Sequence, residues 1–378
     1  MILLHGTGTH NKGAELMAVA VLQHFRSRPN PPQFVVPANF GPYPDRARYG
    51  LWTLLAERRL GRAKLVTLLA HRSFCRKYGL VHEREIRAVL DASGFAFGDQ
   101  HGPEPTERMA DQCRRWKRQG KIIILLPQAF GPFSSSRIRK AFRQLVNSCD
   151  LVFPRDPDSY KHVTDVAGQQ PYIHIAPDFT PVIEGMPPVG WRLPDRTLLV
   201  VPNRRMIDKT DSSTSSRYVP FLADVIQLAT GLDLRPALLV HSPEDKELVE
   251  PINRLAGRQL SVLEEPCPVR LKGILAQAYA VVSSRFHALV GALSQAVPAF
   301  AIGWSHKYAR LMDEFGCPAA IAEVGDLVSV RRWLEEVLTD GDSLRCQLSQ
   351  RMAEIAQRIQ AMWNLVDQTL GFDRYLSC

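Results

Sequence analysis

An arginine and a histidine stand two positions apart at the start of a helix-like segment. Residues 285–295 carry apolar side chains at helical spacing and follow the apolar residues 278–282 and two serines. Ser284 or the serine before it can cap the helix, which places Arg285 and His287 in its first turn, at the positive end of the helix dipole. A guanidinium, an imidazole and backbone N–H donors at one helix N-terminus form a binding site for an anion.

The elements around this helix have the order of a parallel sheet. A second apolar run, residues 297–302, follows the helix, so the order is strand, turn, helix, strand. Ligands of open α/β sheets bind at the carboxyl ends of the strands, which is where Arg285 and His287 fall. Either residue alone suits a structural role, as a surface arginine or a buried histidine. The two together directly after a strand favour a functional site.

Strands and helices alternate along the whole chain. The first half opens with a strand, a glycine loop over residues 5–13 and a helix, and a proline- and glycine-rich linker lies at 177–194. We therefore expect an α/β protein with two Rossmann-like domains that face each other across a cleft. The predicted domains are 1–182 on the acceptor side and 195–355 with the anion site, and the terminal helix 356–378 is expected to pack back on the first domain.

Composition bounds the class of protein. The 378 residues carry a net charge of +9, which favours phosphorylated substrates, an acidic membrane surface or nucleic acid as partners. Seven scattered cysteines without paired spacing argue against a disulfide framework and against a zinc module. The first residues lack the pattern of a signal peptide and no apolar run reaches membrane-spanning length, so we expect a cytoplasmic protein.

The basic segment 51–79 has seven Lys or Arg residues and one acid, interleaved with apolar side chains. We predict an amphipathic basic helix or a pair of helices. It would lie peripherally on the inner face of an anionic membrane or receive a lipid-linked substrate. A solvated face over an ordinary core helix is the alternative. Nucleic-acid binding is disfavoured because no recognised module accompanies the segment.

Short motifs at the strand ends resemble the polysaccharide pyruvyl transferase family. They are HNKGAEL, SGFAFGD, LPQAFGPF, FPRDPDS, APDF, LVHSPED and SSRFHALVGALSQAVPAFAIGWSHK, in the family's order from residue 10 to residue 307. Arg285-x-His287 with Lys307 is the most specific piece. The resemblance implies a GT-B-like organisation and transfer of pyruvate from phosphoenolpyruvate to a sugar diol, which gives a ketal and phosphate.

The implied chemistry needs cations, a general acid and a general base. The cations that would hold carboxylate and phosphate are Arg285, Lys307, Arg204 and Arg155. His287 is the candidate acid, because an imidazole titrates near neutrality. The candidate bases are Glu15, Asp99 and Asp178. The other predicted substrate contacts are Ser284, His241, Asn11 and Gly13. The scheme requires no metal and no cofactor, and its partners are phosphoenolpyruvate and a sugar or lipid-linked oligosaccharide.

Two other functions fit parts of the pattern. A nucleotide-sugar-dependent glycosyltransferase of the same fold would hold a diphosphate at the anion site. The carboxylate expected on the ribose near Lys307 is matched only by Asp313 and Glu314 somewhat later, so that pattern is incomplete. A non-catalytic protein that binds surfaces through the basic segment 51–79 would keep that binding after loss of Arg285 and His287.

Overall fold

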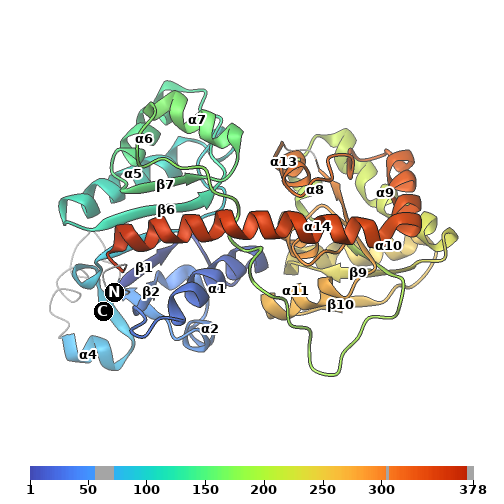
Figure 1. Cartoon of the computed structure of the whole chain (residues 1–378), viewed down its shortest axis with the longest axis horizontal. Coiled ribbons are helices and arrows are strands. Elements are labelled where there is room, and N and C mark those ends of the chain that lie inside the picture. Colours follow the sequence, from blue (N-terminus) through green and yellow to red (C-terminus); the bar gives the residue numbers. More distant parts are fainter. Residues whose placement is uncertain (56–71, 304–305, 373–378) are drawn as a thin grey trace. The chain divides into compact units, whose positions relative to one another are not determined.

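The computed structural model describes residues 1–55, 72–303 and 306–372. The chain divides into two compact units, of which unit 1 comprises residues 1–179 and 358–378 and unit 2 comprises residues 180–357 (Figure 1). Each unit contains one parallel sheet with helices between successive strands. The predicted α/β class with two sheets is therefore confirmed.

Unit 1 is built on a sheet of seven parallel strands. In sheet order they are β4 (Leu80–His82), β3 (Trp52–Leu55), β2 (Phe34–Val36), β1 (Ile2–His5), β5 (Ala88–Asp91), β6 (Ile122–Gln128) and β7 (Leu151–Pro154). Strands β2, β5 and β7 are buried along their whole length. Such continuous apolar runs are typical of parallel strands that are covered on both faces.

The helices of unit 1 connect these strands. They are α1 (Lys12–Arg26), α2 (Tyr43–Arg48), α4 (Arg72–Lys77), α5 (Pro103–Arg118), α6 (Ser136–Val146) and α7 (Pro157–Ala167), with short 3₁₀ turns η1 (Ala38–Phe40), η2 (Glu83–Glu85) and η3 (Asp99–His101). Alternate strand residues, such as Leu3 and Val89, belong to one core cluster with Trp116 of α5 and Phe142 of α6. This alternation decides which strand-end side chains share a face.

The prediction of a helix over the basic segment 51–79 is wrong at its start. Residues Trp52–Leu55 form strand β3, which pairs in parallel with β2 and β4. Backbone pairing on both sides outweighs the helical spacing of these apolar residues. Helix α4 occupies Arg72–Lys77, and residues 56–71 lie outside the described residues.

Unit 2 has a sheet of six parallel strands. In sheet order they are β10 (Val262–Glu264), β9 (Arg235–Val240), β8 (Thr197–Val201), β11 (Ala280–Ser283), β12 (Ala299–Ile302) and β13 (Ile321–Ala322). The central strands β8, β11 and β12 are fully buried. The strand, turn, helix, strand order predicted around Arg285 is confirmed by β11, α12 and β12.

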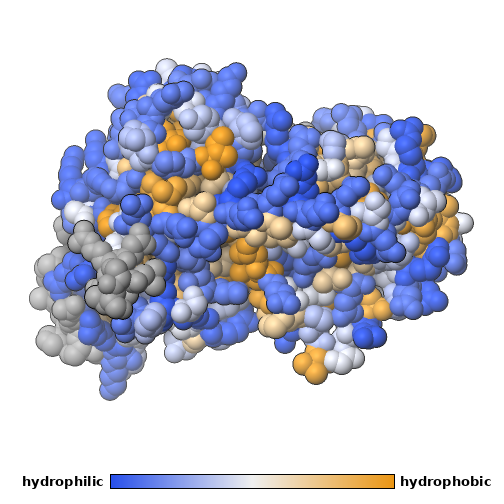
Figure 2. Space-filling view, viewed as in Figure 1, coloured by the Kyte–Doolittle hydropathy of each residue, from blue (hydrophilic) through white to orange (hydrophobic). Residues whose placement is uncertain are grey.

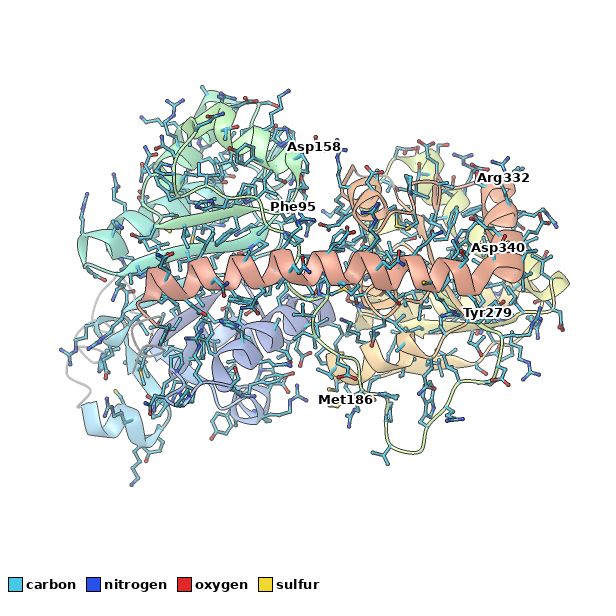
Figure 3. All side chains as sticks on the ribbon, in the orientation of Figure 1. Phe95, Asp158, Met186, Tyr279, Arg332 and Asp340 are labelled. Atoms are coloured by element: carbon cyan, nitrogen blue, oxygen red, sulfur yellow. The ribbon has the colours of Figure 1, made fainter. Side chains whose placement is uncertain are left out.

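The helices of unit 2 connect and follow these strands. They are α8 (Arg205–Asp208), α9 (Ser212–Gly231), the 3₁₀ turn η4 (Pro243–Leu248), α10 (Val249–Ala256), α11 (Pro268–Ala276), α12 (Phe286–Leu293), α13 (His306–Glu314) and α14 (Leu327–Leu370). Helix α14 is interrupted at Asp340, which has non-helical backbone angles. Asp340 lies near Tyr279 in Figure 3, and the Tyr279 hydroxyl donates to the Val337 carbonyl at 3.3 Å.

The last turns of α14 belong to unit 1, as the predicted return of the terminal helix requires. Trp363 stacks on His24 with ring centroids 4.2 Å apart and meets Phe179 edge-on at 5.6 Å. Asp367 forms an ion pair with Arg28 and lies within hydrogen-bond distance of His24 Nε2, at 3.1 Å. An aromatic contact and a shared carboxylate therefore fix the helix end to unit 1.

The visible surface is largely hydrophilic (Figure 2). Among the helices of the described residues, none combines the length and the apolar character that crossing a bilayer demands.

Candidate active site

The carboxyl ends of β9, β8, β11 and β12 lie at one edge of the unit 2 sheet. The loops that follow these neighbouring strands carry most of the residues predicted for this half of the chain, namely His241, Arg204, Ser284, Arg285 and Lys307. Parallel strands end at the same edge, so residues far apart in sequence are brought together there.

Asp245 connects three of these loops. Its carboxylate is fully buried and accepts hydrogen bonds from the Arg204 amide at 2.8 Å and the Ser242 amide at 3.0 Å. It also accepts from Arg285 Nε at 2.9 Å and from Arg285 Nη2. Burial raises the pKa of Asp245, and the hydrogen bonds from Arg285 oppose that rise. The sequence pointed to the LVHSPED motif but did not assign Asp245 this role.

Arg285 is a buried cation held by acidic side chains. Besides Asp245, Glu244 accepts from Nη2 at 3.1 Å, and the Arg285 side chain is only 9% exposed. Burial alone would lower the pKa of Arg285, but the bonds and charges of Asp245 and Glu244 outweigh it and raise the pKa. The guanidinium therefore stays charged. Within the described residues Nη1 makes no hydrogen bond, so that end of the fork remains available to an anion.

His287 and Lys307 lie beside the same helix start. His287 is half-buried in the first turn of α12, and its ring meets Phe286 edge-on with centroids 5.4 Å apart. The Lys307 ammonium lies 5.8 Å from the centroid of the Phe286 ring. The Phe286 ring therefore contacts both the imidazole and the ammonium group. The positive end of the α12 dipole lies at the same place.

The predicted serine cap of this helix is wrong. The N-cap residue is Arg285, which makes no side-chain capping bond, and the Ser283 hydroxyl accepts from the Arg285 amide at 2.9 Å. Ser284 is fully buried, and its hydroxyl accepts from the Tyr218 hydroxyl at 2.9 Å. Its carbonyl accepts from Asn203 Nδ2 at 2.7 Å and from the Tyr308 hydroxyl at 2.7 Å. These bonds anchor the turn through Ser284. The serine does not cap the helix, because the backbone is still extended at Arg285 and the helix begins one residue later.

Arg204 and His241 follow the two neighbouring strands, β8 and β9. The Arg204 guanidinium pairs with Asp208 at 3.4 Å and Glu247 at 3.2 Å, and its side chain is 32% exposed. His241 is buried at the end of β9. Both residues lie at the predicted edge of the sheet, while the charge of Arg204 is shared with two carboxylates.

In unit 1 the predicted residues of the first loop surround the start of α1. Asn11 is the N-cap of α1 and accepts from the Gly13 amide at 2.9 Å. Glu15 is fully buried and accepts from Lys12 Nζ at 2.8 Å, from Arg48 Nη2 at 2.7 Å and from the Tyr49 hydroxyl at 2.7 Å. The Glu15 carboxylate is therefore already bound by two cations and a phenol.

The remaining predicted residues of unit 1 follow other strands. Asp99 accepts from the Ser134 amide at 2.9 Å and from its hydroxyl at 2.6 Å, so it links two loops. Arg155 is buried, with Nε 4.0 Å from Asp156, and Asp178 is buried near the end of unit 1. Figure 3 labels Phe95 and Asp158, which follow β5 and β7 and lie at the same end of the sheet.

Sequence reasoning missed a buried carboxylate at this edge. Asp91 ends β5, is fully buried and accepts from His5 at the end of β1, with Nδ1 2.7 Å from Oδ2. The available signal was an acidic residue that closes an otherwise apolar strand. Within the described ranges, no group of three or more His, Cys, Asp or Glu side chains is arranged to hold a metal ion.

Comparison with known families decides the class of protein. The family model for polysaccharide pyruvyl transferases matches residues 11–306, which is most of the chain. The chain belongs to the polysaccharide pyruvyl transferase family. The match includes Asp245, Arg285 and His287 and ends one residue before Lys307. The family identifies the protein as a transferase of polysaccharide biosynthesis.

Solved structures show the same fold at low sequence identity. A glycosyltransferase from Rickettsia africae is similar with a TM-score of 0.58, 9% identity and 98% of both chains covered. A putative UDP-N-acetylglucosamine 2-epimerase from Listeria monocytogenes has a TM-score of 0.57, 12% identity and 96% of both chains covered. HepE from Anabaena in complex with UDP has a TM-score of 0.56, 13% identity, and 98% of this chain and 99% of that chain covered.

These likenesses establish the GT-B fold of the pyruvyl transferase. No curated protein sequence matches the chain.

Proposed function

We propose that this protein moves pyruvate from phosphoenolpyruvate to two hydroxyl groups of a sugar, forming a ketal and releasing phosphate. The observation that carries the proposal is the family match over residues 11–306, which includes the anion-binding edge of unit 2. That edge supplies what the donor requires. Phosphoenolpyruvate carries a carboxylate and a phosphate, and Arg285 and Lys307 are cations at one helix start.

The reaction must move two protons. The sugar diol loses both hydroxyl protons, the methylene carbon of phosphoenolpyruvate gains one, and the departing phosphate carries the other. A group that donates a proton to the methylene carbon must lie near the bound donor. In our proposal His287 is that general acid, because it shares the first turn of α12 with the anion site and an imidazole exchanges protons near neutral pH.

The proposal is tested by calorimetric titration of phosphoenolpyruvate. Arg285→Lys keeps a positive charge beside Asp245 but removes Nη1, so we expect binding to weaken about 10-fold or more from the loss of one charge-assisted contact. His287→Gln should keep donor binding and lose turnover. Arg332→Ala, a change at an exposed cation of the same unit (labelled in Figure 3), is the matched control and should bind as the wild type does. Wild-type protein that binds no phosphoenolpyruvate, with or without mixed glycans, would contradict the proposal.

The second candidate function is nucleotide-sugar-dependent glycosyl transfer. The specific observation in its favour is that HepE of Anabaena, which has this fold, was solved in complex with UDP. At 13% identity that likeness speaks for the fold alone. The same calorimeter separates the candidates, because binding of UDP-glucose in place of phosphoenolpyruvate would favour glycosyl transfer.

The acceptor in our proposal is a sugar diol of a polysaccharide or of its lipid-linked precursor. Contact with an anionic membrane through the segment 51–79 belongs to the same proposal, although residues 56–71 lie outside the described residues. Sedimentation with vesicles of 30 mol% phosphatidylglycerol tests it. Retention of the protein in the supernatant would contradict the membrane part alone.

A further inference from the structure

His5 and Asp91 stand side by side at the carboxyl edge of the unit 1 sheet. Strands β1 and β5 pair in parallel, and the register sets His5 opposite Asp91. Leu3 and Val89, two positions earlier in each strand, both belong to the core cluster that contains Trp116. Because side chains alternate between the faces of a strand, His5 and Asp91 share that face. The result is a hydrogen bond of 2.7 Å between Nδ1 and Oδ2.

The Asp91 carboxylate accepts from several groups in addition to His5. The Ser93 hydroxyl donates at 3.0 Å and the Ser93 amide at 3.3 Å. Gln128 Nε2, at the end of β6, donates at 3.0 Å. Each of these groups is a donor, which suits an ionised carboxylate as the common acceptor. The bond to Asp91 favours the tautomer in which Nδ1 donates and Nε2 holds the lone pair.

The loops that form this network approach each other closely. Gly6 follows His5 with a φ of +78°, and a Cβ at that position would lie 2.0 Å from the Ser93 hydroxyl oxygen. Only glycine allows both the backbone angle and the approach. The Trp116 ring meets the His5 ring edge-on with centroids 6.2 Å apart. The imidazole is therefore fixed by the carboxylate and by the core.

The His5 imidazole is partly accessible. Its side chain is 30% exposed, whereas Asp91 is 0% exposed. The Gln128 amide that bonds Asp91 is fully buried, so it supports the carboxylate from inside the protein. A substrate can therefore approach this network at the imidazole and not at the carboxylate.

We propose that His5 is the general base that takes a proton from the acceptor sugar and that Asp91 positions it. The assignment rests on the proposed function for the identity of the donor. The role of His5 toward the acceptor does not require that donor, because any transfer to a hydroxyl group requires removal of the hydroxyl proton.

The O–H bond of one sugar hydroxyl breaks, its proton goes to His5 Nε2, and its electron pair forms the new C–O bond to C2 of the donor. The methylene carbon of the donor gains one proton. The second hydroxyl replaces phosphate, which leaves with the second proton. His5 then returns its proton to solvent, so the step needs no oxidant or reductant.

Two of the carboxylates predicted as bases, Glu15 and Asp99, compare poorly with His5. Glu15 is fully buried and already accepts from two cations and a phenol. Asp99 accepts from both the amide and the hydroxyl of Ser134. The His5 ring is held through Nδ1 and its side chain is partly exposed, which suits a general base that a substrate must reach.

The first test needs no substrate. Long-range ¹H–¹⁵N spectra of the histidine rings distinguish the two neutral tautomers, and the His5 signals are assigned by their loss in His5→Gln. We expect a proton on Nδ1 and none on Nε2, and we expect Asp91→Asn to shift the ring toward the other tautomer. A proton on Nε2 in the wild type, or a tautomer unaffected by Asp91→Asn, would overturn the proposal.

The second test measures turnover as phosphate released from phosphoenolpyruvate, with a panel of p-nitrophenyl hexopyranosides that have free 4- and 6-hydroxyl groups. His5→Gln should lower kcat about 10²- to 10⁴-fold, the usual contribution of a positioned base, with unchanged calorimetric affinity for phosphoenolpyruvate. His10→Gln changes an exposed histidine of the same loop and should leave kcat as in the wild type. Equal kcat for His5→Gln and the wild type would refute the role of His5.

The two proposals fail in different ways. Wild-type protein that neither binds phosphoenolpyruvate nor releases phosphate contradicts the proposed donor, while the tautomer of His5 still tests the dyad. Wild-type turnover that survives His5→Gln contradicts the dyad and leaves the donor assignment intact.

Discussion

The two sheets end in polar networks of different character. In unit 2 the buried carboxylate Asp245 holds a buried arginine and two backbone amides, which in our proposal bind the anionic donor. In unit 1 the buried carboxylate Asp91 holds a partly exposed imidazole, which in our proposal takes a proton from the acceptor. Both networks lie at the carboxyl edge of a parallel sheet. They differ in the side chain that the buried acid holds.

The comparison predicts that loss of the unit 2 carboxylate costs most. Asp245→Ala would leave the Arg285 cation buried without its main partner, and we expect the free energy of unfolding to fall by about 3–5 kcal/mol. Urea denaturation followed by circular dichroism measures it. Asp91→Ala, the matched change in unit 1, leaves a partly exposed imidazole and should cost about 1–3 kcal/mol. An equal fall in the free energy of unfolding in the two variants would contradict the difference between the two networks.

Glu15 is a second buried carboxylate of unit 1 and can be compared with Asp91. Its buried contacts with Lys12, Arg48 and Tyr49 predict a structural role, so Glu15→Ala should lower the free energy of unfolding by about 1–3 kcal/mol. We expect kcat of the folded variant to stay within a few-fold of the wild type. Unfolding curves and steady-state rates are compared on the same preparations. A large loss of kcat at unchanged stability would restore Glu15 as the base and argue against His5.

Variants of Asn11 distinguish helix capping from substrate contact. Its side chain accepts from the amides of Gly13 and Ala14, so Asn11→Ala should lower the free energy of unfolding by about 1 kcal/mol. Asn11→Asp keeps a capping oxygen and serves as the control in thermal unfolding. If Asn11→Asp retains stability but loses turnover, Asn11 contacts substrate in addition to capping α1.

Glu244 gives the smallest effect and has a defined pH dependence. Burial works against its ionisation, but backbone hydrogen bonds and Arg285 prevail and lower its pKa below the ordinary value of 4.5. The stabilisation from this group is therefore present above that ordinary value and is lost as pH falls through the lowered pKa. Because the side chain is 37% exposed, it amounts to at most about 1 kcal/mol. Glu244→Gln should abolish this pH dependence, as denaturation at pH 3 and pH 7 would show.

The same variant probes the anion site. Removing a negative charge that lies 3.1 Å from Arg285 should strengthen phosphoenolpyruvate binding by about 2- to 5-fold at neutral pH, the equivalent of up to about 1 kcal/mol. Calorimetry against Glu247→Gln, an exposed acid that faces Arg204, provides the comparison. Weaker binding in Glu244→Gln would mean that Glu244 orients Arg285 more than it opposes the anion.

The sequence by itself determined the alternation of strands and helices, the position of the turn at Arg285 and the family. These depend on local patterns: apolar runs such as 297–302, helical spacing after Arg285, and motifs written in consecutive residues. The strand at Trp52–Leu55 escaped this reasoning, because its pairing partners β2 and β4 are separate in sequence and short apolar runs suit either structure.

Only the tertiary structure decided how the polar residues are used. Sequence spacing says that Arg285 follows a strand, but not that Asp245, 40 residues earlier, meets it in the neighbouring loop. It says that Glu15 and Asp91 are acidic, but not that two cations engage the first while an imidazole 86 residues away engages the second. The physical reason is that strand order and register place these groups, and both arise from packing of the whole sheet.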